Sequence, residues 1–514
     1  MTQSEALAIL ESGQSVLLTG AAGAGKTYLL NQFIRRARED GKSVAVTATT
    51  GLAATHLNGA TIHAWSGIGV RDALDGMFYN KLSKQRADLI TKADVLIIDE
   101  ISMLHDFRLD MVEEVTRTLR GGDRPFGGLQ VILCGDFFQL PPVNRSDARQ
   151  GSFVTASQAW QNGHFLVCYL EEQHRQSDDE MYHAILNGIR GGQLMRSQLE
   201  ALQARSQATA DPFTPRTRLL TTNVDVDTIN HVHLDELEAE EYEYEMETTG
   251  NKRYVEQLKK SCLAPETLRL KHGAVVMCIK NSQDKKYVNG SLGVIEDFEP
   301  GTDYPVVKLT NGKEVTIKPE SWELVDGDKR RATLTQLPLR LAWAITVHKS
   351  QGMTLDSARI DLSKAFVEGM GYVALSRVRG LKDLILDGMN GMALRTSGLA
   401  RALDGELRAR SDQAREDNLR TIEEWLMHEQ TRNQKVEKPK VKKEGSSWSE
   451  KIERMREDYP NAYKPWSENE DVKLVKLFAA ENGVKTLSKL MGRHPGSIRA
   501  RLKKHFGDDV IMKP

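Results

Sequence analysis

Eight consecutive residues constrain the fold of this chain more than any other feature. From Gly20 to Thr27 the sequence fits the pattern G-x-x-x-x-G-K-[ST], and it directly follows the apolar run at 16–18. This context predicts a strand, a glycine loop and a helix, whose first amides and positive end surround phosphate groups. We expect Lys26 to neutralise the β- and γ-phosphates and the Thr27 hydroxyl to bind Mg²⁺. A fortuitous glycine turn is the alternative, and the partners described below argue against it.

The first 155 residues alternate strand and helix signals. Amphipathic stretches such as 27–38 separate apolar runs that predict buried parallel strands at 16–19, 44–47, 95–99 and 129–135. We therefore expect an α/β domain over residues 1–155 that binds ligands at the carboxyl ends of its strands. A small insert is expected at about 56–82.

A second region, 156–400, again carries short apolar strands, at 217–221, 342–346 and 358–361. Within it, residues 268–332 contain short β-branched runs joined by the hairpin dipeptides Asn289-Gly290 and Asn311-Gly312. We expect a second α/β domain interrupted by a small β-barrel. The acidic stretch 235–247 before the barrel is interpreted as the solvated face of a helix.

After about residue 400 the composition changes. Residues 401–430 have a helical, charged pattern, and 431–447 have the composition of a basic linker that contains Pro, Gly and Ser. Residues 448–514 are expected to form a small separate helical module.

Charge, cysteine usage and hydropathy narrow the class of protein. The 514 residues carry 70 Lys and Arg against 71 Asp and Glu, so local basic patches rather than overall charge would attract nucleic acid. The four cysteines show no C-x-x-C spacing, and we expect buried free thiols in a reducing compartment. Without a signal-peptide pattern or an apolar run of about 18 residues, we expect a cytoplasmic protein with no membrane span.

Two further strand ends carry candidate catalytic side chains. The apolar run at 95–98 ends in Asp99 and Glu100, which we expect to hold Mg²⁺ and to orient or deprotonate the attacking water. Gln139 follows the strand at 129–135 and is a candidate reporter of the γ-phosphate, and two prolines stiffen the exit of that strand. Solvent-facing acids and a simple proline-terminated strand are the respective alternatives.

Arg175 and Arg377 both lie in the second region, where either could act as an arginine finger. Such arginines stabilise the charge of a transferred phosphoryl group and raise rates by about 10³–10⁵. Fingers on a second domain would make closure of a cleft and hydrolysis one event. Each arginine alone is more often a surface ion pair, so this prediction depends on the whole set of motifs.

Hydroxyl and imidazole donors gather at two sets of positions, and donors of this kind suit the phosphates of a bound nucleic-acid strand. The first region contributes Thr49, Thr50, Thr61 and His63, and the second contributes Thr346, His348 and Ser350. A metal site is the competing interpretation of the histidines. No carboxylate or cysteine cluster in the sequence accompanies them, which disfavours it.

Taken together and in this order, the motifs resemble the superfamily-one DNA helicases, most closely the petite-integration-frequency (Pif) helicases and their RecD-like relatives. The resemblance covers about residues 1–400 and rests on Arg175 and the segments 20–27, 47–54, 59–63, 99–100, 135–143, 270–277, 342–354 and 372–377. It implies two RecA-like P-loop domains with an inserted Src-homology-three-like barrel, ATP and Mg²⁺ between the domains, and single-stranded DNA across their top. It further implies 5′-to-3′ movement that unwinds duplex, fork or G-quadruplex DNA in replication, repair, recombination or telomere maintenance.

The resemblance also assigns roles to residues. Gln3 is similar to the adenine-reading glutamine, and Gln139, Arg175 and Arg377 are similar to γ-phosphate contacts that act with Lys26 and Glu100. The remaining nucleotide contacts are expected at Gly20, Ala21, Ala22, Gly23, Ala24, Gly25, Thr27 and Gly352. Pro142 and Val143 join the expected DNA contacts.

The tail departs from the family core. Ser467 is expected to cap a first helix, and a second helix should carry Leu487 and Leu490. The last helix is basic, and the module resembles a Myb-like or helix-turn-helix DNA-binding domain. Its expected DNA contacts are Arg493, Arg499, Arg501, Lys503 and Lys504. A protein-docking helical bundle is the alternative.

An ATP-dependent DNA helicase is therefore the leading hypothesis for function. A DNA-stimulated ATPase that translocates or remodels protein–DNA complexes without separating strands is the alternative. A helicase subunit of a nuclease is a third idea, although the sequence shows no carboxylate-rich nuclease motif. A monomer is the default expectation, with replication or repair proteins as candidate partners.

Overall fold

The computed structural model describes the chain except at residues 58, 70, 145–148, 177–178, 207–216, 223–225, 283, 285, 327–328, 438–455, 457, 463, 465, 481–482 and 507–514. The chain divides into two compact units, Met1–Leu426 and Met427–Pro514, and each is described by itself. No helix among the described residues is long and apolar enough to cross a membrane.

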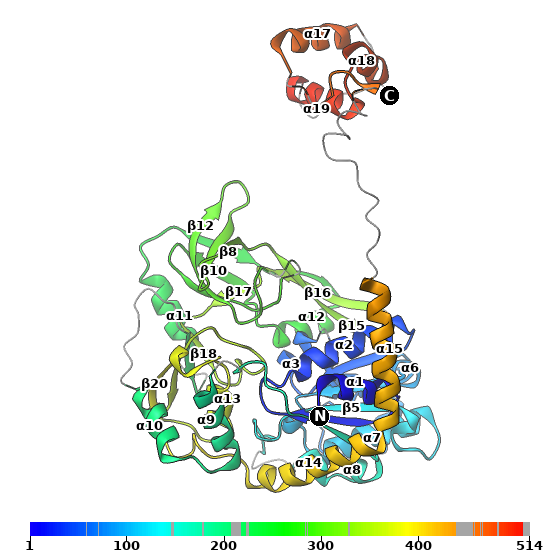
Figure 1. Cartoon of the computed structure of the whole chain (residues 1–514), viewed down its shortest axis with the longest axis vertical. Helices are drawn as coiled ribbons and strands as arrows, with labels where there is room; N and C mark the ends of the chain where they lie inside the picture. The colour runs from blue at the N-terminus through cyan, green and yellow to red at the C-terminus, as the bar shows by residue number, and fades with distance from the viewer. Residues whose placement is uncertain are drawn as a thin grey trace. The chain divides into compact units, whose positions relative to one another are not determined.

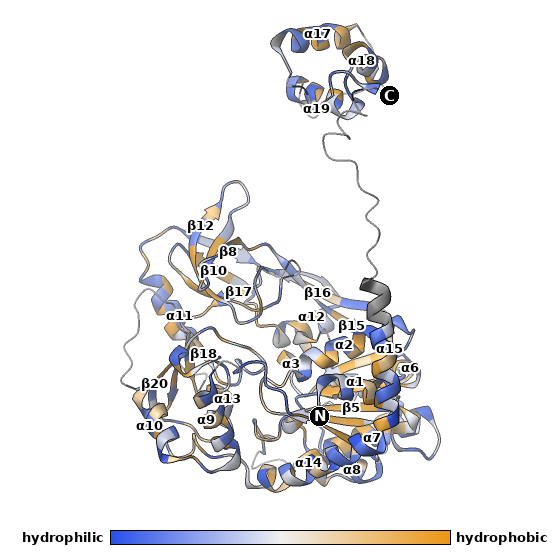
Figure 2. Ribbon diagram, in the orientation of Figure 1, coloured by the Kyte–Doolittle hydropathy of each residue, from blue (hydrophilic) through white to orange (hydrophobic). Residues whose placement is uncertain are grey.

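A six-stranded parallel sheet forms the centre of the first domain (Figure 1). Its strand order is β3-β2-β4-β5-β1-β6, with bounds β1 Val16–Gly20, β2 Val44–Ala48, β3 Ala60–Thr61, β4 Val95–Asp99, β5 Gln130–Gly135 and β6 Leu166–Leu170. Every residue of β1, β4 and β5 is buried, as their continuous apolar sequence predicts for strands covered on both faces. Figure 2 shows β5 in the colour of hydrophobic residues.

Eight α-helices precede the second domain among the described residues: α1 Gln3–Glu11, α2 Lys26–Glu39, α3 Gly51–His56, α4 Ile62–Trp65, α5 Phe78–Lys81, α6 Lys84–Lys92, α7 Asp106–Arg120 and α8 Gln158–Asn162. The insert expected at 56–82 holds β3, α4 and α5. The domain boundary predicted at residue 155 is wrong, because β6 pairs with β1 along its whole length. The isolated run at 166–170 gave no local sign of which sheet it would join.

The second domain is a four-stranded parallel sheet in the order β18-β7-β19-β20. The bounds are β7 Thr217–Leu220, β18 Ala344–Thr346, β19 Ala358–Leu362 and β20 Leu384–Met389, and its helices are α9 Glu180–Gly191, α10 Arg196–Ala204, α11 Val226–Asp235 and α13 Met370–Leu375. Apolar residues of both domains, among them Leu133 and Ile345, belong to one continuous core. The two RecA-like domains expected from the sequence are therefore present and packed together.

Between β7 and β18 the chain forms three antiparallel sheets and the helix α12 Lys252–Ser261, which packs against the sheet of β15, β16 and β9. The largest has the order β14-β13-β12-β11-β17, and the smaller sheets are β15-β16-β9 and β10-β8. The bounds are β8 Glu241–Glu245, β9 Glu247–Gly250, β10 Thr267–Lys271, β11 Val275–Cys278, β12 Leu292–Glu299, β13 Tyr304–Leu309, β14 Glu314–Thr316, β15 Glu320–Asp326, β16 Lys329–Gln336 and β17 Leu339–Leu341. The region expected at 268–332 is thus part of a larger insert.

The acidic stretch 235–247 is not a helix face over most of its length. Residues 241–245 form β8, in which glutamates alternate with Tyr242 and Tyr244, and the exposure alternates with them. Tyr242 stacks on Phe298 of β12 with ring centroids 3.8 Å apart. Glutamate and tyrosine alternate with the two-residue period of a strand, a signal that the number of acidic residues alone does not reveal.

Two helices follow the second domain, α14 Gly398–Asp417 and α15 Leu419–Glu437, shown in yellow and orange in Figure 1. Ile422 of α15 is buried in the apolar core that holds Leu7 and Phe33, and Trp425 Nε1 donates a hydrogen bond to Glu11 Oε2 at 2.6 Å. The helix α15 runs seven residues into the predicted linker 431–447. The rest of that linker lies outside the described residues.

Among its described residues, the tail contains the helices α17 Glu468–Ala479, α18 Val484–Met491 and α19 Pro495–Phe506. Leu474, Leu487, Ile498 and Leu502 form its apolar core. Ser467 caps α17 as predicted, since its Oγ accepts a hydrogen bond from Glu470 N at 3.3 Å. The residues of 448–514 that are described therefore form a small helical module with its own core.

Candidate active site

A cavity of about 1270 Å³ lies where the carboxyl ends of β4 and β5 and the loop after β1 face the second domain. It gathers predicted residues from six segments far apart in the sequence. Its lining includes Lys26, Thr27, Asp99, Glu100, Gln139, Arg175, Gly352 and Arg377. The nucleotide site expected from the motifs is therefore assembled in one place.

The loop from β1 to α2 has the backbone that its glycines allow. Gly23 and Gly25 have φ of 91° and 82°, in the left-handed region that favours glycine. A Cβ on Gly25 would lie 2.0 Å from Gln3 Nε2, so a side chain there would displace Gln3. Lys26 Nζ donates to the carbonyl oxygens of Gly20 and Ala21 at 2.9 and 3.0 Å, which holds the ammonium over the loop.

Gln3 begins α1 beside this loop. Its Nε2 donates to Ala24 O at 3.2 Å and lies 2.9 Å from His174 Nε2. Gln3 therefore lies next to the phosphate loop, and its role as the adenine-reading side chain stays a prediction. His174 was not singled out from the sequence, and it also lines the cavity.

Two carboxylates stand at the end of β4: Asp99, its last residue, is buried, and Glu100, which follows it, is half-buried. Glu100 has a left-handed backbone (φ 54°), and its N–H donates to Asp99 Oδ1 at 2.9 Å. Burial raises the pKa of both carboxyls, and the charge of Asp99 helps to raise the pKa of Glu100 to about 7. A carboxyl with that pKa is suited to accept a proton at neutral pH.

The residues that could hold Mg²⁺ are Thr27, in the first turn of α2, and Asp99. One hydroxyl and one carboxylate beside a phosphate loop suit Mg²⁺, which keeps several waters and binds nucleotide phosphates. Such a site needs no cage of protein ligands. In the described part of the chain, no three His, Cys, Asp or Glu side chains are grouped as metal ligands.

The two predicted arginines differ in their placement. Arg175 follows β6 of the first sheet, so its assignment to the second domain is corrected together with the boundary. Its Nη1 donates to Ser376 O at 2.9 Å, and burial together with the nearby Arg377 lowers its pKa to about 9. Two neighbouring guanidinium groups at one cavity favour a polyanionic ligand such as a triphosphate.

Arg377 is only 2% exposed and is held by its own domain. Its Nε donates to Val373 O at 2.7 Å, and its Nη1 donates to the carbonyl oxygens of Ser350 and Met353 at 3.3 Å each. The side chain therefore braces the turn that follows β18 and also borders the cavity.

Gln139 and a residue missed by sequence reasoning meet at the base of the cavity. Gln139 Nε2 donates to Asp136 Oδ2 at 3.5 Å. Gln351 Nε2, from the second domain, donates to Glu100 Oε2 at 2.9 Å and to Gln139 Oε1 at 3.4 Å. Gln351 lies inside the motif at 342–354, but no local sequence pattern indicates that its amide reaches Glu100.

A buried charge network was also missed. Arg190 Nη1 of α9 donates to both carboxylate oxygens of Asp136 at 2.8 Å and to the Tyr372 hydroxyl at 3.0 Å. That hydroxyl donates to Asp136 Oδ2 at 3.2 Å and accepts from the N–H of Ala22 at 3.0 Å. The network joins the phosphate loop and the end of β5 to two helices of the second domain. No local pattern marks Arg190.

Several predicted DNA contacts of the first domain have structural partners. Thr50 caps α3, and Thr61 caps α4. Thr49 Oγ1 donates to Glu100 O at 2.9 Å. His63 Nε2 lies 3.0 Å from Arg108 Nη1, and burial with the charge of Arg108 lowers the pKa of His63 to about 4. Thr49 and His63 therefore have partners within the protein, whereas the cap oxygens of Thr50 and Thr61 act as acceptors in these bonds and their hydroxyls can still donate.

Besides Thr49, three more predicted DNA contacts of the two α/β domains are buried and are corrected here. Thr346 and Ser350 are fully buried, since they hold the turn after β18: Thr346 Oγ1 accepts from Lys349 N, and Ser350 Oγ donates to Val347 O. Pro142 is buried as well. By contrast Val143 is exposed, and His348 is half-buried with its ring 6.5 Å from that of the exposed Phe366.

The basic residues of the tail also divide into two groups. Arg493 is 2% exposed, pairs with Glu470 at 3.0 Å and lies over the Trp466 ring. Arg501 pairs with Asp471. Both therefore stabilise the module, and their assignment as DNA contacts is corrected. Exposed basic side chains of α19 are Arg499 and Lys504, whereas the side chain of Lys503 lies outside the described part.

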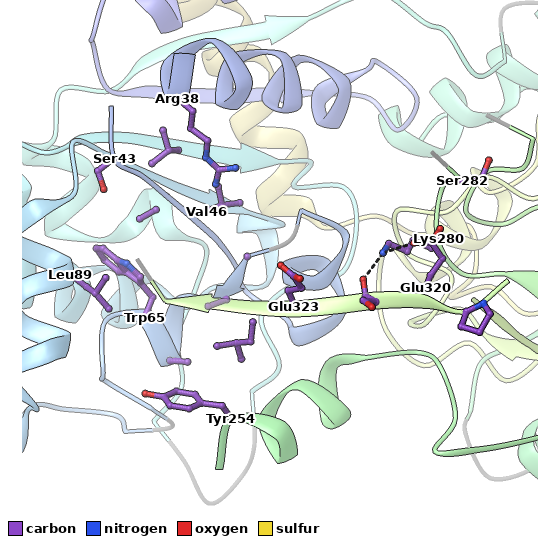
Figure 3. A pocket seen from close by; sticks show the side chains of 18 of the residues that line it. Arg38, Ser43, Val46, Trp65, Leu89, Tyr254, Lys280, Ser282, Glu320 and Glu323 are labelled. Atoms are coloured by element: carbon purple, nitrogen blue, oxygen red, sulfur yellow. Dashed lines mark hydrogen bonds and ion pairs between the residues drawn. The ribbon is translucent and has the colours of Figure 1, made fainter. Parts of the chain in front are cut away.

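A second cavity, of about 1320 Å³, separates the edge of the first sheet from the insert (Figure 3). Trp65 and Leu89 lie on one side of it, and Lys280 pairs with Glu320 at 3.3 Å on the other. None of the residues predicted for nucleotide or DNA binding lines this cavity. Of these two cavities, only the first is lined by residues that the motifs predict to bind nucleotide or DNA.

Comparison with known proteins agrees with this geometry. The family described as PIF1-like helicase matches residues 3–195, and the family described as DNA helicase Pif1, 2B domain, matches residues 253–298. The ATP-dependent DNA helicase Pif1 of Psychrobacter sp. is 42% identical over 485 residues, a match that covers 82% of this chain and 73% of that protein.

Solved structures of Pif1 from Bacteroides sp. are similar throughout the larger unit. The complex of that protein with ADP-AlF4 has a TM-score of 0.69 at 30% identity and covers 80% of this chain and 97% of the Bacteroides chain. The same protein bound to single-stranded DNA has a TM-score of 0.55 at 31% identity, with the same coverage of both chains. The chain belongs to the PIF1-like helicase family.

Proposed function

We propose that this protein is an ATP-dependent DNA helicase that moves 5′-to-3′ on single-stranded DNA and unwinds duplex, fork or G-quadruplex DNA. One observation carries the proposal. A single cavity between two RecA-like domains collects a phosphate loop, two adjacent carboxylates, a glutamine and two arginines. A nucleotide bound there touches both domains, so its hydrolysis can change how they are placed.

The residues of the cavity divide the work of ATP hydrolysis. Lys26 and the loop amides bind the phosphates, and Glu100 accepts a proton from the attacking water. Arg175 and Arg377 neutralise charge that develops on the γ-phosphate, and Gln139 lies where it can report its presence. Mg²⁺ would be held by Thr27 and Asp99, and when bound it supplies positive charge at the β- and γ-phosphates.

The surface beside the cavity is suited to a nucleic-acid strand. The His348 and Phe366 rings are near one another on the second domain, and Phe366 is 61% exposed. Aromatic faces of this kind stack on bases without regard to sequence. The Bacteroides relative has been solved with single-stranded DNA. The direction of movement and the G-quadruplex substrate rest on membership of the family.

An unwinding assay tests this proposal directly. One partial duplex carries a 5′ single-stranded tail and the other a 3′ tail, and the Glu100→Gln variant serves as the control. We expect ATP-dependent opening of the 5′-tailed substrate only, lost in the control. Opening of the 3′-tailed substrate would contradict the proposed polarity. DNA-stimulated hydrolysis with neither substrate opened would instead indicate a remodelling ATPase.

A further inference from the structure

The side chain of Gln351 crosses the cavity from the second domain to the candidate base on the first. It is 9% exposed, and its Nε2 donates to Glu100 Oε2 at 2.9 Å and to Gln139 Oε1 at 3.4 Å. The carboxylate oxygen that accepts this bond is held in place by the amide. One of the two oxygens with which Glu100 could take a proton from water is therefore engaged by Gln351.

The segment that carries Gln351 is a tight turn after β18. Gln351 N donates to His348 O at 3.3 Å, and Met353 N donates to Ser350 O at 3.0 Å. Arg377 donates to the carbonyl oxygens of Ser350 and Met353 on the same turn. Because these bonds tie the turn together, a displacement at His348 reaches Gln351 and the Arg377 guanidinium.

The position of the amide gives it a definite effect on Glu100. Gln351 Nε2 approaches Glu100 Oε2 from the second domain at 2.9 Å, so the bond fixes the direction in which that oxygen points. Withdrawal of Gln351 would free Oε2 to accept a hydrogen bond from the attacking water.

We propose that Gln351 is a positioning residue for Glu100. Its hydrogen bond holds the carboxylate while no DNA contacts the turn 347–353, and this bond breaks when a DNA strand contacts that turn at His348. The proposal rests on the proposed function, since it needs DNA at this surface. It explains in one contact how DNA binding on the outside of the second domain stimulates hydrolysis inside the cleft. The bond between Gln351 and Gln139 fits the same proposal. The movement that withdraws Gln351 from Glu100 also frees Gln139, the candidate γ-phosphate reporter.

The test replaces Gln351 by Met, which keeps the length of the side chain and removes the donor. Gln351→Asn is a second variant, with an amide too short to reach Glu100, and Gln161→Met is the matched control on the exposed helix α8. ATP turnover of the full chain is measured with and without an oligothymidylate strand, and binding of that strand is followed separately by fluorescence anisotropy.

We expect Gln351→Met and Gln351→Asn to raise the DNA-free turnover number about three- to tenfold at about pH 8, with the DNA-saturated value and the KM for ATP within about twofold of wild type. The stimulation by DNA should shrink by the same factor. The change should appear in the turnover number and not in the KM for ATP. A role in folding alone would not produce this split, because a partly unfolded chain loses turnover both with and without DNA.

Other outcomes separate the inference from the proposed function. Unchanged DNA-free turnover in both variants, or slower turnover with and without DNA, would overturn the role given to Gln351 while leaving a DNA-stimulated ATPase intact. If the wild-type chain bound no oligothymidylate, or hydrolysed ATP equally with and without it, the proposed function would fail and the inference with it.

Discussion

Two adjacent carboxylates at the end of β4 acquire different properties from their surroundings. Asp99 and Glu100 both lie near the charge of Lys26, but Glu100 also meets the charge of Asp99 and the amide of Gln351. The left-handed backbone at Glu100 turns the chain sharply at this point. Such strain in a residue other than glycine is found where the surrounding structure enforces it, often at functional sites.

The pH dependence of hydrolysis follows from the pKa of Glu100. A pKa of about 7 means that the base loses its proton, and so becomes active, as the pH rises through neutrality. We expect the turnover number to rise between about pH 6 and pH 8 and then to level off. The measurement is steady-state ATP hydrolysis against pH at saturating ATP and DNA. A flat profile over that range would contradict a general-base role for Glu100.

The role of Lys26 can be isolated from folding. Lys26→Ala removes the ammonium that lies over the phosphate loop, and no ion pair of Lys26 is found among the described residues, so the domain should stay folded. We expect ATP hydrolysis to fall by about 10³-fold or more, with an unchanged circular dichroism spectrum and melting temperature. Near-normal turnover in the folded variant would refute the assigned site.

At the scale of elements, the contact between the two domains depends on charge as well as apolar packing. Arg190 of α9 holds Asp136, which follows β5, and Tyr372 of α13 holds both Asp136 and the phosphate loop. The charge of Arg190 keeps the pKa of Asp136 below its usual value despite complete burial. A backbone N–H of the phosphate loop, that of Ala22, is therefore hydrogen-bonded to a side chain of the second domain.

Removal of one partner from this buried pair should be costly. Arg190→Met leaves the Asp136 charge buried without its counter-ion, and we expect it to lower the free energy of unfolding by about 3–5 kcal/mol. The control Arg196→Met breaks a surface pair with Glu200 and should cost about 0.5 kcal/mol or less. Urea titration of each variant provides the measurement.

The double variant Asp136→Asn with Arg190→Met completes that experiment. It removes both charges, so it should be more stable than Arg190→Met alone. A double variant that is as unstable as the sum of the two single changes would show that the pair contributes through shape rather than through charge.

At the scale of the whole molecule, the chain joins a motor to a small basic module. In that module Arg493 and Arg501 are occupied by Glu470 and Asp471, which leaves the basic surface to residues such as Arg499 and Lys504. A DNA-binding tail of this kind would add affinity through phosphate contacts without touching the nucleotide site.

Truncation after Glu437 tests the module while it keeps α15 intact. We expect DNA-stimulated hydrolysis to persist, DNA affinity to fall, and the dependence of affinity on salt to become shallower, because fewer phosphates are neutralised. Arg499→Gln combined with Lys504→Gln in the full chain should reproduce part of that change, whereas Lys473→Gln on the exposed side of α17 should not. A salt slope that is the same with and without residues 438–514 would argue for a protein-docking role instead.

The amino-acid sequence by itself determined the features that are written within a few neighbouring residues. The phosphate loop, the carboxylates at the end of the run at 95–99, the cap at Ser467 and the hairpin turn at Gly312 all depend on local backbone preferences or on a short motif. Gly290, by contrast, ends a long connection between β11 and β12. Two α/β domains followed from the repeated alternation of strands and helices. These are properties of spacing and residue type, so they can be recognised before the chain is folded.

Only the tertiary structure decided which groups face one another. The pairing of β6 with β1, the burial of Thr346 and Ser350, and the occupation of Arg493 by Glu470 each depend on residues that are distant in sequence. The contact of Gln351 with Glu100 joins side chains 251 positions apart. Burial and hydrogen-bond partners are set by packing between elements, and a local pattern contains no information about the surface that an element will meet.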